Sequence, residues 1–362
     1  MSHRSAAGIA VVVAALAIPA GASAATKTVA AGPPLTKPPA GVPGYADGPQ
    51  FFRETTTIHV GDTVRWKIFG FHTIYFPKKG GQNVPVAVPD PSRQYAGELD
   101  PAGQAFWFNG QTQIIGNPAA FFPLGGKSEN GSKATSSGVP TTEDPTKFTY
   151  KLKFPKVGTY TYYCTIHPRM KARIKVVPKS ARIPSAAADK KAVDKQLAKT
   201  VADIKRSNKR KDPAGNVVEV GRDTRTTSLL NFFPAKKTVA VGTTVDFRIS
   251  PEPNDPHTVT FGNDAVFAKG GYAEKLEQAI FSPLPGTGQG GPPVLGIPGA
   301  ALFPSDPGAL AFDGTQHGGF LNAGFLGSKP LLADSKVTFT AAGTYNYICL
   351  LHPFMRGQIV VQ

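Results

Sequence analysis

Two stretches of the chain alternate hydrophobic and polar residues at the period of a β-strand. The first spans residues 57–68, where Val64, Trp66 and Ile68 share one face after a turn at Gly61. The second spans residues 241–249 and repeats the same pattern. Because successive side chains of a strand point to opposite faces, each stretch predicts a half-buried strand.

These strands belong to a longer repeat. A Gly-Thr-Tyr strand runs into the motif Cys-x-x-His-x-x-Met twice, first at Cys164, His167 and Met170 and then at Cys349, His352 and Met355. The second motif lies 185 residues after the first, and the upstream histidines His72 and His257 keep this interval. A short insertion in the second copy, residues 252–255, shifts the register of the earlier strands. Two copies of one domain account for the pattern.

The repeat predicts a division of the chain, which is long enough for two cores. The predicted parts are a signal peptide (1–24), a flexible Pro-rich tether without structure (25–45), a first domain (46–178), a basic helical linker (179–225) and a second domain (226–362). Each domain carries a long insert rich in Gly, Pro and Phe, at 77–146 and 262–335. Loops of such length usually act as covers or binding surfaces, so we expect short strands and helical turns within them.

The linker contains one helical pattern. Val193, Leu197, Val201 and Ile204 recur at helical spacing after a Pro184-Ser185 start signal, which predicts an amphipathic helix over 186–207 with this stripe packed. The linker holds thirteen Lys or Arg and six Asp or Glu. We expect a solvated helix docked on one domain; the alternative is a surface for acidic polymers or lipid headgroups, such as an anionic cell surface.

The N-terminal sequence indicates the compartment of the protein, and the composition indicates its net charge. Arg4, an apolar run and a small-residue site before Ala25 are typical of a secretory signal, so we expect an exported protein that is extracellular, on the cell surface or periplasmic. The net charge of +16 favours acidic partners. Two cysteines in an exported chain also allow a single disulfide, although a disulfide would leave the paired His and Met unexplained.

The repeated motif predicts a soft-metal site in each copy. Thiolate and thioether favour copper, and two His, one Cys and a weak axial Met form the ligand set of blue-copper centres. Zinc is the competing ion for the Cys and two His, but a thioether is not among its usual ligands. The tyrosines before each Cys are expected to be core aromatics.

The chain resembles two cupredoxin domains in tandem, of the plastocyanin and azurin family, and residues 347–361 closely resemble the copper loop of the amicyanins. The resemblance implies an all-β fold of two Greek-key β-sandwiches and two type 1 copper sites. The implied ligands are His72, Cys164, His167 and Met170 in the first domain, and His257, Cys349, His352 and Met355 in the second. Thr73 and Thr258 stand where family members often have an Asn that braces the cysteine loop, and their hydroxyls are expected to replace it.

The resemblance also implies electron transfer to redox partner proteins. We expect no nucleic acid among the partners. In this family electrons usually enter and leave through the exposed edge of the downstream His. Around that edge, the second domain is expected to have an apolar rim formed by Leu350, Leu351, Pro353 and Phe354. The first domain, with Arg169 in place of Phe354, is expected to have a more cationic rim. A multicopper oxidase or nitrite reductase would need more histidines than His59 and His317 supply. Copper storage, or a surface module without electron transfer, remains an alternative.

Overall fold

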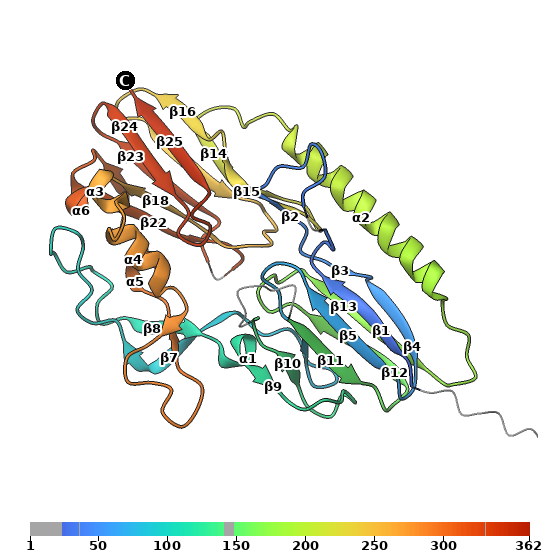
Figure 1. Cartoon of the computed structure of the whole chain (residues 1–362). Helices are drawn as coiled ribbons and strands as arrows, with labels where there is room; N and C mark the ends of the chain where they lie inside the picture. The colour runs from blue at the N-terminus through green and yellow to red at the C-terminus, as the bar shows by residue number, and fades with distance from the viewer. Residues whose placement is uncertain (1–23, 36, 141–147, 330) are drawn as a thin grey trace, which may run out of the picture.

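A computed structural model gives the structure and describes residues 24–35, 37–140, 148–329 and 331–362 (Figure 1). The predicted signal peptide, apart from Ala24, lies outside the described residues. Most elements are β-strands, which form five sheets within the described part of the chain. The all-β class is therefore confirmed.

Two sheets enclose the first hydrophobic core. Trp66 is fully buried at its centre, and the ring of Tyr162 lies 5.5 Å away, centroid to centroid. One sheet has the strand order β3 (Phe51–Phe52), β1 (Thr26–Ala31), β5 (Thr63–Ile68), β11 (Thr149–Lys153). The other has the order β4 (Thr55–His59), β13 (Lys171–Val177), β12 (Gly158–Tyr163), β6 (Tyr75–Phe76), β10 (Thr135–Ser137), β9 (Pro123–Leu124).

A second pair of sheets encloses a second core around Phe247, Phe261 and Tyr347. One sheet has the order β2 (Ala46–Asp47), β15 (Ser228–Phe233), β14 (Val217–Asp223), β17 (Thr244–Ile249), β23 (Asp334–Phe339), β21 (Leu310–Phe312). The other has the order β16 (Lys236–Val239), β25 (Arg356–Val361), β24 (Gly343–Ile348), β18 (His257–Gly262), β22 (Phe320–Leu326). The order β15-β14-β17-β23 matches β3-β1-β5-β11, and β16-β25-β24-β18 matches β4-β13-β12-β6.

We call residues 24–178 the first half and residues 209–362 the second half. The division into two Greek-key domains with the boundaries given above stays a prediction, but two of those boundaries miss strands. The tether was expected to lack structure, yet β1 pairs in parallel with β5 and buries Val29 and Ala31. Likewise β14, placed in the linker, pairs in parallel with β17. Both strands are short and Ala- or Val-rich, and their partners are distant in sequence, so local alternation did not reveal them.

The long inserts contain the expected short strands and helical turns. A fifth sheet has the order β19 (Ser282–Pro283), β20 (Leu295–Gly296), β8 (Thr112–Gly116), β7 (Ala87–Gln94). The short helices are α1 (Pro118–Phe121), α3 (Asp264–Phe267), α4 (Tyr272–Ala279), α5 (Gly299–Leu302) and α6 (Gln316–Gly319). Because β8 comes from the first half and β20 from the second, the two inserts share one sheet.

An apolar cluster accompanies this sheet and joins the inserts further. Tyr95 and Phe108 of the first insert pack with Phe320 and Leu350 of the second half. The hydroxyl of Tyr95 donates to the carbonyl of Ile297 at 3.1 Å. The inserts therefore join the two halves through shared packing and a shared sheet.

The linker helix α2 (Ala186–Asn208) follows the prediction closely at its start. The Ser185 side chain caps it by accepting from Ala188 N at 3.2 Å. The predicted packed stripe is only partly correct, because Ile204 is buried whereas Val193, Leu197 and Val201 are half-buried. The helix instead turns a polar face inward, and its buried residues are Thr200, Asp203, Ile204 and Ser207.

Helix α2 contacts both halves rather than one. Gln196 donates to the carbonyl of Phe51 in β3 at 3.0 Å. Near its other end, Ile204 packs with Leu229 and Phe233 of β15. In Figure 1 the helix runs along the outside of the molecule past both sets of sheets. The interpretation of a helix docked on one domain was therefore wrong.

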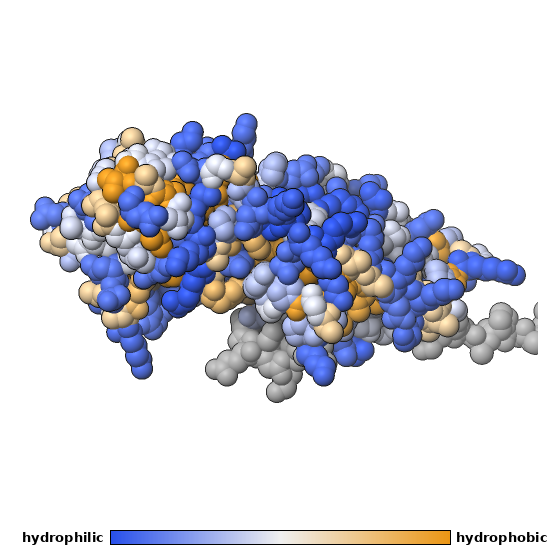
Figure 2. All heavy atoms as spheres, turned by 90° about the horizontal axis from the view of Figure 1, so that it is seen from above, coloured by the Kyte–Doolittle hydropathy of each residue, from blue (hydrophilic) through white to orange (hydrophobic). Residues whose placement is uncertain are grey.

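One face of the molecule can be seen to be mostly polar (Figure 2). The face shown in Figure 2 is largely hydrophilic, with hydrophobic residues in separate areas. None of the helices in the described part of the chain has the length and hydropathy needed to cross a membrane.

Candidate metal centres

His72, Cys164 and His167 meet at one end of the first core. His72 lies just before β6, whereas Cys164 and His167 follow β12, which pairs with β6, so the ligands come from neighbouring strand ends. The Nδ1 atoms of His72 and His167 are 3.0 Å apart, and Cys164 Sγ lies 3.4 Å from His167 Nδ1. All three side chains are buried. The structure thus brings together three of the four residues predicted for the first site.

The second half repeats this arrangement with His257, Cys349 and His352. The Nδ1 atoms of the histidines are 3.1 Å apart. Cys349 Sγ lies 3.7 Å from His257 Nδ1 and 3.6 Å from His352 Nδ1. We call the two groups the first and second centres.

The spacing of these atoms fits a metal ion. A triangle with the three edges of the second centre has a midpoint about 2 Å from each corner, close to typical metal–imidazole and metal–thiolate bond lengths. The short distances between the Nδ1 atoms show that both rings of each centre turn Nδ1 to the shared position. His72 Nε2 and His257 Nε2, on the other side of their rings, have no hydrogen-bond partner among the described residues. The donor set of each centre therefore suits a transition metal.

Backbone hydrogen bonds close each loop at its three-residue steps. In the first loop, Cys164 N donates to Met170 O and Met170 N donates to His167 O, both at 2.9 Å. In the second, Met355 N donates to His352 O at 2.7 Å. These bonds return each Met to the core cluster that contains its Cys. The role of Met170 and Met355 as fourth ligands stays a prediction.

The predicted bracing by threonine is confirmed. Thr73 N donates to Cys164 Sγ at 3.4 Å, and its hydroxyl accepts from Thr165 N at 2.8 Å. Thr258 N donates to Cys349 Sγ at 3.3 Å, and its hydroxyl accepts from Leu350 N at 2.8 Å. Each threonine therefore ties the strand end of the upstream His to the cysteine loop. Such outer contacts hold ligands in place before a metal binds.

The local field favours the thiolate. Burial would raise the pKa of the Cys164 thiol, but His167 and His72 lower it well below its usual range. Burial would also raise the pKa of Cys349, and hydrogen bonds with His257 and His352 lower it well below that range. Because the thiolate is the form that binds metals, both cysteines are prepared as ligands.

The pKa values of the downstream histidines, His167 and His352, are raised, in contrast to those of the thiols. Burial would lower the pKa of His167, whereas Asp255 and Cys164 raise it well above its usual value. The pKa of His352 is also raised, because Cys349 and Asp255 outweigh its burial. One carboxylate, Asp255, therefore acts on both centres.

Asp255 was not singled out from the sequence as a site residue. Its Oδ1 lies 2.9 Å from His167 Nε2, although Asp255 belongs to the second half. Burial would raise the pKa of its carboxyl, but His167, His352 and His257 bring it well below the usual range. The signal in the sequence was the insertion 252–255, which breaks the constant interval of the repeat.

Two glycines were also missed. Gly32 and Gly221 have φ of +84° and +77°. A Cβ at either position would lie 2.8 Å from Nε2 of the upstream histidine, His72 or His257. Each therefore leaves room for an imidazole ring, in the strand regions that sequence alternation did not reveal.

The predicted rims are partly corrected. Leu350 is 1% exposed and packs under the insert cluster, so it does not belong to a surface rim. Leu351 and Pro353 are half-buried, and Phe354 is 58% exposed beside His352. Arg169 pairs with Glu252 at 2.9 Å, so part of the predicted cationic rim is engaged by the second half.

The other predicted alternatives can be placed in the structure. Cys164 and Cys349 are free and belong to different centres, so the structure does not join them in a disulfide. His59 contacts the carbonyl of Ala181, and His317 lies between Asp100 and Asp306. Neither histidine joins a centre.

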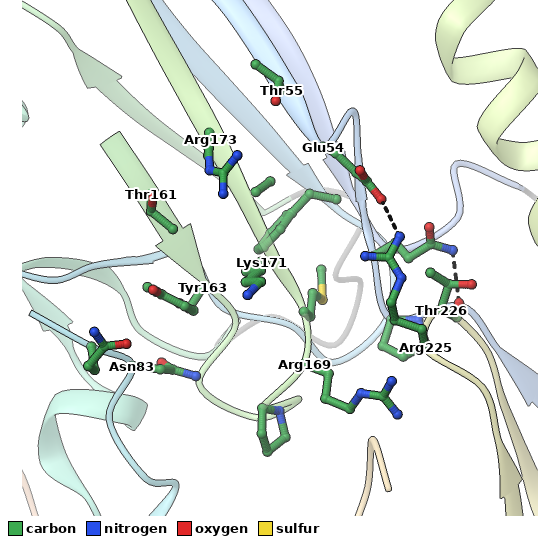
Figure 3. A pocket seen from close by; sticks show the side chains of 17 residues that line it. Glu54, Thr55, Asn83, Thr161, Tyr163, Arg169, Lys171, Arg173, Arg225 and Thr226 are labelled. Carbon is green, nitrogen blue, oxygen red and sulfur yellow. Dashed lines mark hydrogen bonds and ion pairs between the residues drawn. The ribbon is translucent and has the colours of Figure 1, made fainter. Parts of the chain in front are cut away.

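A cationic groove of about 730 Å³ borders the first centre. Its lining includes Arg169, Lys171, Arg173 and Arg225, which Figure 3 shows around the opening. Arg225 is paired with Glu54 at 3.0 Å, the dashed line that joins these two labelled residues in the figure. Lys171 and Arg173 are exposed on the outer face of β13.

No family model matches the chain. Amicyanin of Paracoccus denitrificans is 65% identical over 26 residues, which are 7% of this chain and 20% of that protein. Amicyanin-alpha of Methylorubrum extorquens is 50% identical over 36 residues, 9% of this chain and 30% of that protein. The matched segments thus span less than a third of these relatives.

Solved amicyanin structures are also similar to parts of the chain. Amicyanin from Paracoccus versutus shows 19% identity over 41% of this chain and 84% of that chain, with a TM-score of 0.21. A Cu(I) form of an amicyanin mutant shows 21% identity over 43% of this chain and 89% of that chain, with a TM-score of 0.19.

Proposed function

We propose that the chain is a tandem cupredoxin-like protein with two type 1 copper sites that carries electrons. The first centre, with Met170, would hold one ion, and the second centre, with Met355, the other. The observation that supports this most is the duplicated group of two imidazoles and one thiol, whose ligand atoms lie within 4.8 Å of one another in each half and which is buried apart from the half-buried His352. The repeated strand order and the short amicyanin match support it as well.

Copper fits the donor set better than zinc. Each loop returns a buried Met to the core cluster that contains its Cys, and thioether with thiolate selects copper among the common transition metals. When bound, copper would alternate between Cu(II) and Cu(I) and so accept and release one electron. The protein's part is to hold the three donors in one arrangement for both states, through the threonine bonds and the closed loops.

Electron transfer fits the geometry better than storage. The centres are buried and braced, which limits rearrangement when the charge of an ion changes. In the second centre the ring of His352 lies 6.0 Å from that of Phe354, centroid to centroid, and Phe354 is exposed. We infer that this edge is the contact point for redox partner proteins. We infer no separate enzymatic activity, because His59 and His317 are engaged elsewhere.

We infer acidic partners from the charge of the surface. The cationic groove beside the first centre offers Lys171 and Arg173 to a carboxylate-rich surface, and such attraction raises association rates at low salt. The N-terminal sequence supports export, to the periplasm, the cell surface or the medium.

Copper loading tests this function. Purified protein is titrated with Cu(II), and the visible spectrum and the copper content per chain are recorded together. We expect an intense blue thiolate-to-copper band with two coppers per chain. Cys164→Ser and Cys349→Ser should each remove half of the band and one copper. Storage without electron transfer would instead give colourless Cu(I) binding and slow electron self-exchange.

Thr165→Ser serves as the control variant, because it keeps a hydroxyl next to Cys164 and removes no donor atom. It should retain both coppers and the full band. Zinc in place of copper after loading with both metals, or a colourless Cu(II) complex, would contradict the proposal.

A further inference from the structure

The insertion in the second half contacts the first centre directly. Residues 252–255 lie between β17 and β18, and the first half has no counterpart in the sequence. Glu252 meets Arg169 with both its carboxylate and its backbone carbonyl, at 2.9 and 2.5 Å. Asp255 reaches His167 Nε2 at 2.9 Å. The insertion therefore covers the Nε2 edge of the His167 ring, and His167 is 5% exposed.

The inserted loop is held firmly on the second half. Asn254 is buried, and its side-chain amide donates to the carbonyls of Thr224 and Thr227 at 3.0 and 3.2 Å. Its backbone N–H donates to Asp223 in β14 at 3.2 Å. Asp255 follows Asn254 directly, so its carboxylate is fixed by the same contacts.

Asp255 also stands next to the second centre along the chain. His257, a member of that centre, follows Asp255 after only one residue, Pro256. A continuous connection therefore runs from His167 through one hydrogen bond and one short peptide segment to His257.

We propose that Asp255 is a positioning residue that joins the two centres into one electron-transfer unit. This inference rests on the proposed function. Its hydrogen bond from His167 Nε2–H fixes Nδ1 as the ligand atom, and its peptide link to His257 completes the route. With copper held by His72, Cys164 and His167 in one centre and by His257, Cys349 and His352 in the other, one electron would pass from the reduced ion to the oxidised one. No covalent bond forms or breaks, and the proton on His167 Nε2 stays in place.

The route divides the roles of the two downstream histidines. His352, beside exposed Phe354, meets partners in solution, whereas His167 faces inward toward the second centre. An electron that enters at the second centre therefore reaches the first without a second encounter. The cationic groove then remains free to hold a partner of the first centre.

Pulse reduction of the fully oxidised, copper-loaded protein tests the route. Fewer electrons than chains are delivered, and the two centres are followed with the optical and paramagnetic resonance spectra of Cys164→Ser and Cys349→Ser as references. We expect a redistribution phase whose rate is independent of protein concentration. Asp255→Ala should slow it by at least about tenfold, the usual effect of losing such an outer partner. Asp255→Asn keeps an acceptor and should retain most of the rate.

Glu252→Ala is the matched control, because it removes the neighbouring carboxylate contact with Arg169 and leaves the bond between His167 and Asp255. Its redistribution rate should be unchanged. A second measurement needs no electron transfer: in the Cu(I) protein, the Nε2 proton of His167 should exchange slowly with solvent, and exchange fast only in Asp255→Ala.

The outcomes separate this inference from the proposed function. Absence of two blue coppers would overturn the proposed function itself. With both coppers present, a redistribution rate proportional to protein concentration would overturn the route whatever the variants do. An unchanged rate in Asp255→Ala would also overturn it.

Discussion

Gly32 and Gly221 control the space beside the upstream histidines. A Cβ at Gly221 would approach His257 Nε2 to 2.8 Å, closer than a carbon and a nitrogen normally pack. Gly242 has a similar φ of +81°, but a Cβ added there would meet no atom within 4 Å. An alanine at Gly242 would therefore cause backbone strain alone, whereas an alanine at Gly221 would cause the same strain and a close contact with the imidazole.

We expect Gly221→Ala to weaken copper binding at the second centre and to lower stability by about 1–3 kcal/mol, since strain and contact add. Gly242→Ala should cost about 1 kcal/mol from strain alone and leave copper binding unchanged. Chelator competition in a Cys164→Ser background, with thermal unfolding, measures both effects. Equal copper affinity in the two variants would show that the contact does not matter.

Asp223 gives a pH dependence to the stability of the copper-free protein. Burial, and then the charge of Asp255, raise its pKa to about 6. The folded state therefore holds this proton more tightly than the unfolded state, whose aspartate pKa is about 3.9. The contribution to stability is lost as pH rises from about 4 to about 6, by at most about 3 kcal/mol.

Asp223→Asn should remove this loss, because the amide stays neutral and its oxygen can still accept from Asn254 N. Urea denaturation of both proteins at pH 4 and pH 7.5 tests this. We expect the variant to be the more stable protein at pH 7.5 and the difference to shrink at pH 4. A difference that is constant with pH would contradict the assigned titration.

The histidines and cysteines that can bind a metal were the easiest residues to predict. The histidines and cysteines of both centres stood out because the same types recur at one interval. Gly32, Gly221 and Asp255 could not be found in this way, because each acts on a histidine through a contact between distant segments. Their residue types carry no signal until the fold is known.

At the scale of elements, helix α2 shows how a polar face can serve as an interface. Its stripe of Val193, Leu197 and Val201 suggested an apolar contact, yet the helix approaches β3 with Gln196 and Thr200. Of the stripe, Ile204 alone is buried, and it packs with residues of β15 and of the segment 42–46. Helical periodicity predicted the element and its cap, but not the face that packs.

Ile204→Ala should therefore lower the free energy of unfolding by about 2–4 kcal/mol, the usual cost of emptying a buried site. Val193→Ala, in the half-buried part of the same stripe, is the control and should cost less than about 1 kcal/mol. Chemical denaturation of the two variants compares them. Similar losses would mean that the whole stripe packs, as the sequence alone suggested.

At the scale of the whole molecule, the halves are joined at several separate places. The inserts share a sheet through β8 and β20, α2 spans both halves, and β2 of the N-terminal segment pairs with β15. The sequence predicted the repeat but not this interlocking, because Gly- and Pro-rich inserts carry little periodicity. Strand pairs between inserts also depend on contacts about 180 residues apart, which no local pattern records.

We expect the two halves to unfold together. Trp107 of the first insert donates to the carbonyl of Pro304 in the second half, whereas Trp66 lies in the first core. In Trp107→Phe, fluorescence reports on Trp66 alone, while circular dichroism reports on all the sheets. The two denaturation midpoints should coincide. A separate, earlier transition in either signal would show that the halves are independent.

The four inserted residues also change the symmetry of the molecule. Two identical copies could meet through the same surface on each, but here a loop of one copy meets a metal loop of the other, and the contact is not returned. Such a heterologous contact gives the chain a direction, with one histidine edge filled and one left open. A duplication that began as two equal units has thereby become a protein with an inner and an outer end.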